Sequence, residues 1–178
     1  MARLKKIELS DAEGPVREIL EGLNTKLGRV PNIFQGLANS QVALKSYMDL
    51  SGNLAASGLT PFEREAIALL VAQKNQCEYC LAAHTTIGAG AGIDAEEAVK
   101  IRKGQASDPK VRVLIQLASS ILETKGSVSD EILCQARTAG YNDGQIAETV
   151  TTVVLNVYTN FFNHVNQTER DFPEAPEI

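Results

Sequence analysis

Residues 60–84 read TPFEREAIALLVAQKNQCEYCLAAH, and this stretch decides both the fold class and the candidate chemistry. It opens on Thr60-Pro61-Phe62-Glu63, which combines an N-cap hydroxyl, a proline at the first helical position and a glutamate at the third. Ala66 to Ala72 then follows without a polar residue. A helix that is apolar on every side is typical of a protein core or a subunit contact. We therefore expect a buried helix here.

The rest of the chain also predicts helices, bounded by capping residues, glycines and prolines. Ser10-Asp11-Ala12-Glu13 predicts a capping box before a helix that ends near Asn24. Asn142-Asp143-Gly144-Gln145 predicts the start of the last helix, which reaches about Gln167. No turn signal lies between alternating strand patterns, so the predicted fold class is all-α. Further helices are expected over about 41–57, 77–88, 94–102, 109–125 and 129–139.

Length and composition predict one globular domain over residues 1–178. Hydrophobic residues make up 44% of the chain and charged residues 22%, which are ordinary globular values. We place the core that contains the candidate chemistry at about 40–95 and a short proline-containing tail at 171–178. The 17 Lys and Arg against 22 Asp and Glu leave a net charge of −5, and no basic run could follow a phosphate backbone. Nucleic acid is therefore not an expected partner.

The chain is also predicted to work in the cytoplasm, away from membranes. Its opening MARLKKIE has no apolar signal core, and no segment reaches the roughly 18 apolar residues of a membrane span. Three cysteines cannot form a disulfide framework without leaving one over. Two of them, Cys77 and Cys80, are three residues apart. In a reducing compartment that spacing indicates redox or metal chemistry.

The cysteines share a predicted helix face with a histidine. Cys77, Cys80 and His84 stand at i, i+3 and i+7, within an arc of about 60° at 100° per residue. Cys77 lies near the helix start, where the macrodipole and free N–H groups favour a thiolate. His84 could accept or hold a thiol proton. Because the preceding helix must fold back across a short turn, Glu65 could bring a carboxylate to the same face.

The same cysteines and histidine allow three other interpretations: haem attachment, a zinc site and a purely structural role. Attachment of a c-type haem needs histidine directly after the second cysteine, whereas three residues intervene here. A zinc site would need a fourth ligand, such as Glu65, and three ligands on one helix face are not a usual finger spacing. Two core cysteines with a hydrogen-bonded histidine is the purely structural interpretation. We predict no metal and no cofactor.

Three further residues are assigned structural roles. Cys134 is predicted to be a small core residue. His164 could approach the site from the last helix, although a hydrogen-bonded structural histidine is the favoured interpretation. Tyr79 is expected to point away from the cysteine face and to serve packing.

The candidate residues fall in a known pattern. The stretches 59–65 and 75–84 resemble the core of the AhpD-like alkylhydroperoxidases, in the carboxymuconolactone decarboxylase superfamily. Glu65, Cys77, Cys80 and His84 all stand at the family spacing. The resemblance covers about residues 40–95, and the end of the chain, over 159–164 and 171–173, is similar to a peroxidase-related branch of the family.

The resemblance implies a helical fold, a homo-oligomer (trimer or hexamer) and thiol-dependent peroxidase or disulfide reductase activity. By position, Cys80 resembles the peroxide-attacking thiol, Cys77 the resolving thiol, and His84 with Glu65 the proton relay. A dithiol, either a protein or lipoyl-type, would be the electron donor. Tyr79 stands where the founding enzyme has histidine, which puts that enzyme's peroxiredoxin-linked physiology and lipoyl-type donor in doubt here. The decarboxylase branch lacks the cysteine pair, which argues against lactone decarboxylation.

The leading hypothesis is a thiol peroxidase that reduces hydroperoxides. Its alternatives are a disulfide reductase that serves a partner protein and a redox-sensing oligomer without turnover. The residues themselves also favour self-association. Apolar groups occupy more than one face of the last helix over 146–162. One core of this size is not expected to bury both these groups and the apolar helix over 66–72.

Overall fold

The computed structural model describes residues 1–178 and confirms the all-α prediction. The chain forms nine α-helices and one short 3-10 helix, and it contains no β-strand. No helix combines the length and the apolar character needed to cross a membrane. In chain order, the elements are η1 (Leu9–Asp11), α1 (Gly14–Leu27), α2 (Asn32–Leu37), α3 (Gln41–Ala55), α4 (Pro61–Lys74), α5 (Glu78–Gly90), α6 (Ala95–Arg102), α7 (Pro109–Thr124), α8 (Asp130–Thr138) and α9 (Asp143–Asn166).

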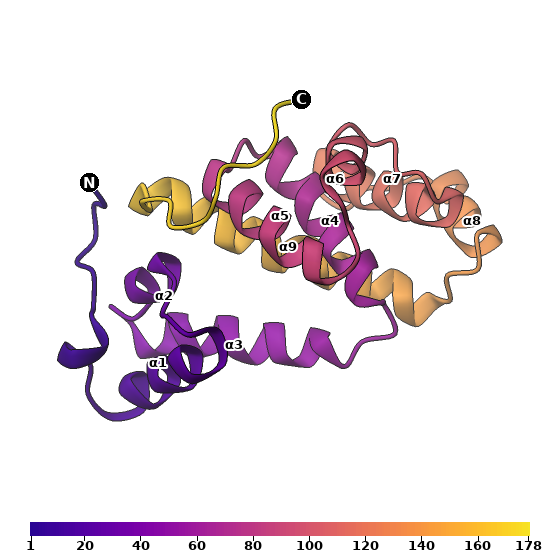
Figure 1. Cartoon of the computed structure of the whole chain (residues 1–178). Coiled ribbons are helices and arrows are strands. Elements are labelled where there is room, and N and C mark those ends of the chain that lie inside the picture. The colour runs from indigo at the N-terminus through magenta and orange to yellow at the C-terminus, as the bar shows by residue number, and fades with distance from the viewer.

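Helix α4 lies at the centre of the molecule (Figure 1). It contacts α5, α6, α7 and α9, and every residue from Ala66 to Ala72 is at most 2% exposed. The prediction of a buried helix is confirmed. Since this one chain buries α4 completely, the helix needs no second subunit to cover it. That part of the sequence argument for an oligomer is removed.

Helices α1, α2 and α3 form a separate layer (Figure 1). They pack on one another through Leu20, Leu37 and Leu44, and the same hydrophobic cluster includes Tyr79 and Leu81 of α5. Helix α3 also contacts α9. The N-terminal layer is thereby joined to the helices around α4 in a single domain.

Capping residues begin most helices where the sequence predicts them. Thr60 with Glu63, and Asn142 with Gln145, form complete capping boxes at the starts of α4 and α9. Side chains also cap the starts of α3, α6, α7 and α8. Each cap satisfies a backbone N–H that has no partner inside the helix.

The predicted capping box at Ser10 is wrong. Ser10 lies in η1, where its hydroxyl contacts the neighbouring Asp11, and α1 begins only at Gly14, without a side-chain cap. Pro15 accounts for the difference, because proline favours the first helical turn and disfavours helix in the residue before it. Helix α1 then ends at Gly28, whose φ of 73° only glycine adopts readily.

Helix α9 buries a stripe of polar side chains together with Val153, and it leaves a row of apolar side chains exposed. Thr149, Thr152 and Asn156 are buried, as are the further members Thr159, Asn160, Asn163 and Asn166. The threonine hydroxyls of 149 and 152 donate to carbonyls one turn earlier, which removes the cost of burying them. The exposed large hydrophobic side chains of α9, between 36% and 63% exposed, are Val150, Val154, Tyr158, Phe161 and Val165.

Candidate active site

The hairpin of α4 and α5 brings the predicted site residues together. After α4, Gln76 takes a left-handed conformation with φ of 55°, which turns the chain back. The N–H of Cys77 donates to the carbonyl of Ala72 at 2.9 Å and secures this turn. Helix α5 then packs along α4, so that Glu65 of α4 meets His84 of α5.

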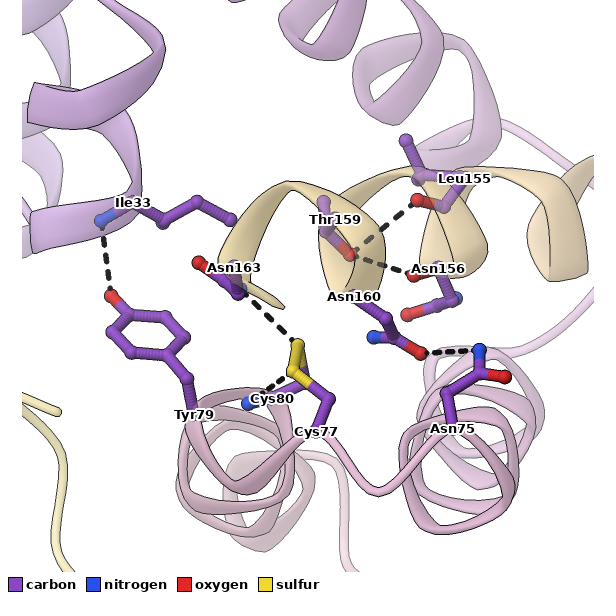
Figure 2. Close-up of a disulfide and its surroundings, with 10 residues drawn as sticks. All are labelled: Ile33, Asn75, Cys77, Tyr79, Cys80, Leu155, Asn156, Thr159, Asn160 and Asn163. Atoms are coloured by element: carbon purple, nitrogen blue, oxygen red, sulfur yellow. Dashed lines mark hydrogen bonds between the residues drawn. A yellow bond between two sulfur atoms is a disulfide. The ribbon is translucent and has the colours of Figure 1, made fainter. Parts of the chain in front are cut away.

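Cys77 and Cys80 form a disulfide at the start of α5 (Figure 2). Their Cα atoms are 5.3 Å apart, within the range that a disulfide requires. Cys77 is the N-cap of α5, and its Sγ accepts a hydrogen bond from the N–H of Cys80 at 3.3 Å. Both side chains are buried, but only Cys80 lines the adjoining cavity. The two sulfur atoms therefore differ in their access to a small molecule.

His84 and Glu65 form a second pair in the same site. Nδ1 of His84 lies 2.8 Å from Oε2 of Glu65, and both side chains are about four-fifths buried. Because a carboxylate only accepts, the proton of a neutral imidazole is held on Nδ1. Nε2 is then free to accept a proton, or to donate one when the ring is protonated.

A cavity of about 650 Å³ lies against Cys80, His84 and Glu65. Ligand sites commonly occupy roughly 300–1,000 Å³, whereas a hydrogen peroxide molecule needs little more room than a water. Half of the 26 lining residues are hydrophobic. Its aromatic lining residues are Phe34, Tyr47, Tyr79 and Phe172. The volume and the lining both suit an organic molecule.

The two tyrosines of this cavity remain neutral. Burial raises the pKa of Tyr47, and burial followed by the charge of Asp171 raises the pKa of Tyr79. The hydroxyl of Tyr79 accepts a hydrogen bond from the N–H of Ile33 at 3.3 Å (Figure 2). Its ring is nearly perpendicular to that of Phe172. The packing role predicted for Tyr79 is confirmed, but the prediction that it points away from the cysteine face is not met, because Tyr79 lines the same cavity as Cys80.

The C-terminal tail forms part of the cavity wall. Phe172 and Pro173 line the cavity. The guanidinium of Arg29 lies 4.5 Å from the centroid of the Phe172 ring and 2.6 Å from the carboxylate of Asp171. Arg102 donates to the carbonyl of Pro176. These contacts hold the predicted tail against the folded chain.

Asn163 of α9 is a site residue that the sequence analysis missed. Its Nδ2 donates to Sγ of Cys80 at 3.2 Å (Figure 2). Asn163 lines the cavity and is 4% exposed. The sequence does contain a pattern that indicates this face. Thr or Asn recurs about every three or four residues from 149 to 166, which forms a polar stripe along one side of the helix.

Two other predictions for single residues are not met. Cys134 is exposed rather than in the core, because α8 turns Ala136 inward and Cys134 toward solvent. His164 is exposed in the last turn of α9, away from the cavity, and its ring makes no hydrogen bond. No group of three His, Cys, Asp or Glu side chains is arranged to hold a metal ion.

Comparison with known proteins relates the chain to a family and to solved structures. The model of the carboxymuconolactone decarboxylase family matches residues 42–108, which include the candidate residues of α4 and α5. No protein with a curated description matches the chain.

Similar structures span nearly the whole chain. A peroxidase-related protein with an alkylhydroperoxidase AhpD core, from Ralstonia eutropha, matches with a TM-score of 0.88 at 22% identity, over 96% of this chain and 92% of that one. A peroxidase-related protein from Silicibacter matches with 0.80 at 23% identity, over 95% and 94%. The debrominase Bmp8, in complex with 2,3,4-tribromopyrrole, matches with 0.80 at 14% identity, over 95% and 91%. At these identities the shared property is the fold.

Proposed function

Residues 42–108 belong to the carboxymuconolactone decarboxylase family and the whole chain has the AhpD-like fold, and on this premise we propose that the protein is a thiol-dependent peroxidase for organic hydroperoxides. One observation carries the proposal: Cys80 lies in the wall of a 650 Å³ cavity that also holds the His84–Glu65 pair. A thiol, a proton carrier and space for an organic substrate are the requirements of this reaction.

The proposed cycle uses the two cysteines in sequence. The Cys80 thiolate attacks the hydroperoxide, an S–O bond forms, the O–O bond breaks, and the alkoxide takes a proton from His84 to leave as an alcohol. Cys77 then attacks the sulfenic acid, which forms the disulfide and releases water. A dithiol donor reopens the disulfide and becomes oxidised itself. Glu65 holds His84 in place and stabilises its protonated form.

We expect the reduced protein to consume cumene hydroperoxide with a kcat/KM at least about tenfold above that for hydrogen peroxide, since burial of only about 60 Å² of apolar surface supplies such a factor. The measurement is the loss of each peroxide in the presence of dithiothreitol. Equal kcat/KM values for the two peroxides would contradict the substrate class.

A pair of adjacent variants controls this result. Ala55 lines the cavity at its exposed rim, whereas the neighbouring Ala56 does not line it. Ala55→Trp should narrow the cavity and lower kcat/KM for cumene hydroperoxide more than for hydrogen peroxide. Ala56→Trp should change neither, because its side chain lies outside the cavity.

The same assay separates the alternatives. A disulfide reductase would reduce a partner's disulfide with a dithiol yet leave peroxides unconsumed. A redox-sensing oligomer would change its assembly on oxidation without catalytic loss of peroxide. We favour the cytoplasm as the place of action, because a reducing compartment keeps the dithiol donor available.

The aromatic lining of the cavity favours a second candidate, reductive dehalogenation of a haloaromatic compound. The balance would be an aryl halide and the Cys77–Cys80 dithiol giving the arene, the disulfide and a hydrogen halide. The debrominase of similar fold makes 2,3,4-tribromopyrrole the natural probe. Dithiol-dependent release of bromide by this protein would support this candidate over the peroxidase.

We further propose that the protein is a homo-oligomer, a trimer or a hexamer. The exposed apolar face of α9, formed by Val150, Val154, Tyr158, Phe161 and Val165, supports this proposal. Light scattering at micromolar concentration should give a trimer or a larger assembly. Phe161→Glu, which places a charge on the face at a position 56% exposed, should shift the protein toward monomer without unfolding it. A monomeric wild type would contradict the proposal.

A further inference from the structure

Helix α9 directs a row of buried amides at the dithiol helix. Asn160 accepts a hydrogen bond from Nδ2 of Asn75, beside the turn before Cys77, at 2.8 Å. One turn later, Asn163 donates to Sγ of Cys80 at 3.2 Å (Figure 2). The amide of Asn163 is the one polar side chain of α9 that reaches a sulfur atom.

The hydrogen bonding of Asn163 is incomplete while the disulfide is closed. Its Oδ1 is buried and has no hydrogen-bond partner, and its Nδ2 has only a disulfide sulfur as acceptor. A buried amide normally finds partners for both ends, because an unpaired polar atom carries a desolvation cost. Sulfur in a disulfide is a weak acceptor, whereas a thiolate is an anion and accepts a stronger, charge-assisted hydrogen bond. The Asn163 contact therefore strengthens when Cys80 becomes a thiolate.

We propose that Asn163 is a positioning residue that stabilises the thiolate of Cys80 and thereby makes it the reactive sulfur of the pair. The inference rests on the proposed function for its role in turnover, but its effect on the thiol is separate. Since the reduced form gains more from the amide than the disulfide does, Asn163 also favours opening of the disulfide by a dithiol donor.

Other charged and titratable groups around Cys80 are common to every variant below. Helix α9 contributes no charged or titratable group to the cavity. The groups that line it come from the end of α1, the loop after α1, and helices α3, α4 and α5. A change at Asn163 therefore isolates the amide. The groups are Lys26, Arg29, Tyr47, Arg64, Glu65, Tyr79 and His84.

The test titrates Cys80 alone, in a full-length background with Cys77→Ser and Cys134→Ser. Removing the exposed Cys134 leaves a single thiol, whose ionisation is followed by thiolate absorbance and by the rate of alkylation with iodoacetamide against pH. A charge-assisted hydrogen bond stabilises the thiolate and not the thiol, so Asn163→Leu should raise the pKa of Cys80 by about one to two units. Asn163→Asp, which is nearly isosteric but places a carboxylate against the sulfur, should raise it further.

Asn156→Leu is the matched control. Asn156 is buried on the same face of α9 and lines the same cavity, but its Nδ2 donates to the carbonyl of Thr152 rather than to sulfur. The pKa of Cys80 should stay close to that of the background protein in this variant. An unchanged pKa in Asn163→Leu, or an equal shift in Asn156→Leu, would overturn the inference. If Asn163→Leu fails to fold, the smaller neutral replacement Asn163→Ala, which also removes the amide and adds no charge, decides the test in the same way.

Two readouts keep this inference apart from the proposed function. In the complete dithiol protein, Asn163→Leu should also shift the equilibrium with dithiothreitol toward the disulfide by at least about tenfold, which corresponds to about 30 mV. Peroxide consumption is measured separately on the wild type. If the thiol shift is found in a protein that consumes no peroxide, the inference about Asn163 stands and the proposed function fails. If peroxide is consumed and the thiol shift is absent, the inference fails alone.

Discussion

Cys80→Ser should reduce peroxide turnover to the uncatalysed level, whereas Cys77→Ser should complete one turnover and stop. The difference follows from the placement of the two sulfur atoms, because only Cys80 lines the cavity. A serine hydroxyl is not ionised at neutral pH and cannot replace the thiolate as nucleophile. Without Cys77, the sulfenic acid formed on Cys80 has no neighbouring thiol to resolve it.

The measurement combines a burst experiment with mass spectrometry. After removal of dithiothreitol, which would itself reduce a sulfenic acid, reduced Cys77→Ser should consume about one equivalent of cumene hydroperoxide per chain and, with dimedone added, carry the adduct on Cys80. Cys134→Ser is the control. Cys134 is exposed and does not line the cavity, so this variant should turn over peroxide at the wild-type rate. Sustained turnover by Cys80→Ser, or a sulfenic acid trapped on Cys77 in the wild type, would show that the roles are assigned wrongly.

Glu65→Gln should lower peroxide turnover by at least about tenfold with fold and assembly unchanged, since general acid–base groups contribute about 100-fold to 10,000-fold. The amide keeps the size of the side chain and can still contact Nδ1 of His84. It cannot, however, stabilise the protonated imidazole by its charge. His84→Ala should show a loss at least as large, because it removes the proton carrier itself.

Glu63→Gln is the matched control on the same helix. Glu63 is buried outside the cavity. Its carboxylate accepts a hydrogen bond from the N–H of the N-cap residue Thr60 and another from the Tyr141 hydroxyl at 2.8 Å. Its loss should lower the free energy of unfolding by about 1–2 kcal/mol, with a smaller effect on turnover than Glu65→Gln. Turnover of Glu65→Gln equal to that of the wild type would remove Glu65 from the mechanism.

The parts of the fold that the sequence predicts correctly depend on residues that are close together in the chain. The caps of α4 and α9 depend on residues three positions apart, so the sequence alone locates them. The meeting of Glu65 with His84 was also predictable, because a short turn between two helices forces them to pack side by side. At Ser10 the same local rule failed, because Pro15 dictated a later start.

The missed parts depend on how distant segments meet. The sequence predicted apolar groups on more than one face of α9, but it did not predict the buried polar stripe, whose threonines bond to their own backbone and whose asparagines reach α5 and the turn before it. The hydrophobicity of the residues does not by itself tell which face of such a helix is buried. The cavity was equally invisible, since its lining comes from α1 through α5, α9 and the tail. Cys134 was placed in the core wrongly, because α8 turns Ala136 inward and leaves Cys134 exposed.

The walls of the cavity and its reactive groups belong to different stretches of the chain. Cys77, Cys80, His84 and Glu65 all lie within one hairpin of 20 residues, counted from 65 to 84. Much of the opposing surface comes from the N-terminal layer and from Phe172 and Pro173 near the far end. Mutations in those outlying segments can remodel what enters the cavity while leaving the hairpin untouched. Such an arrangement separates the segments that shape the cavity from the hairpin that carries the cysteines, so that the two can change independently in sequence.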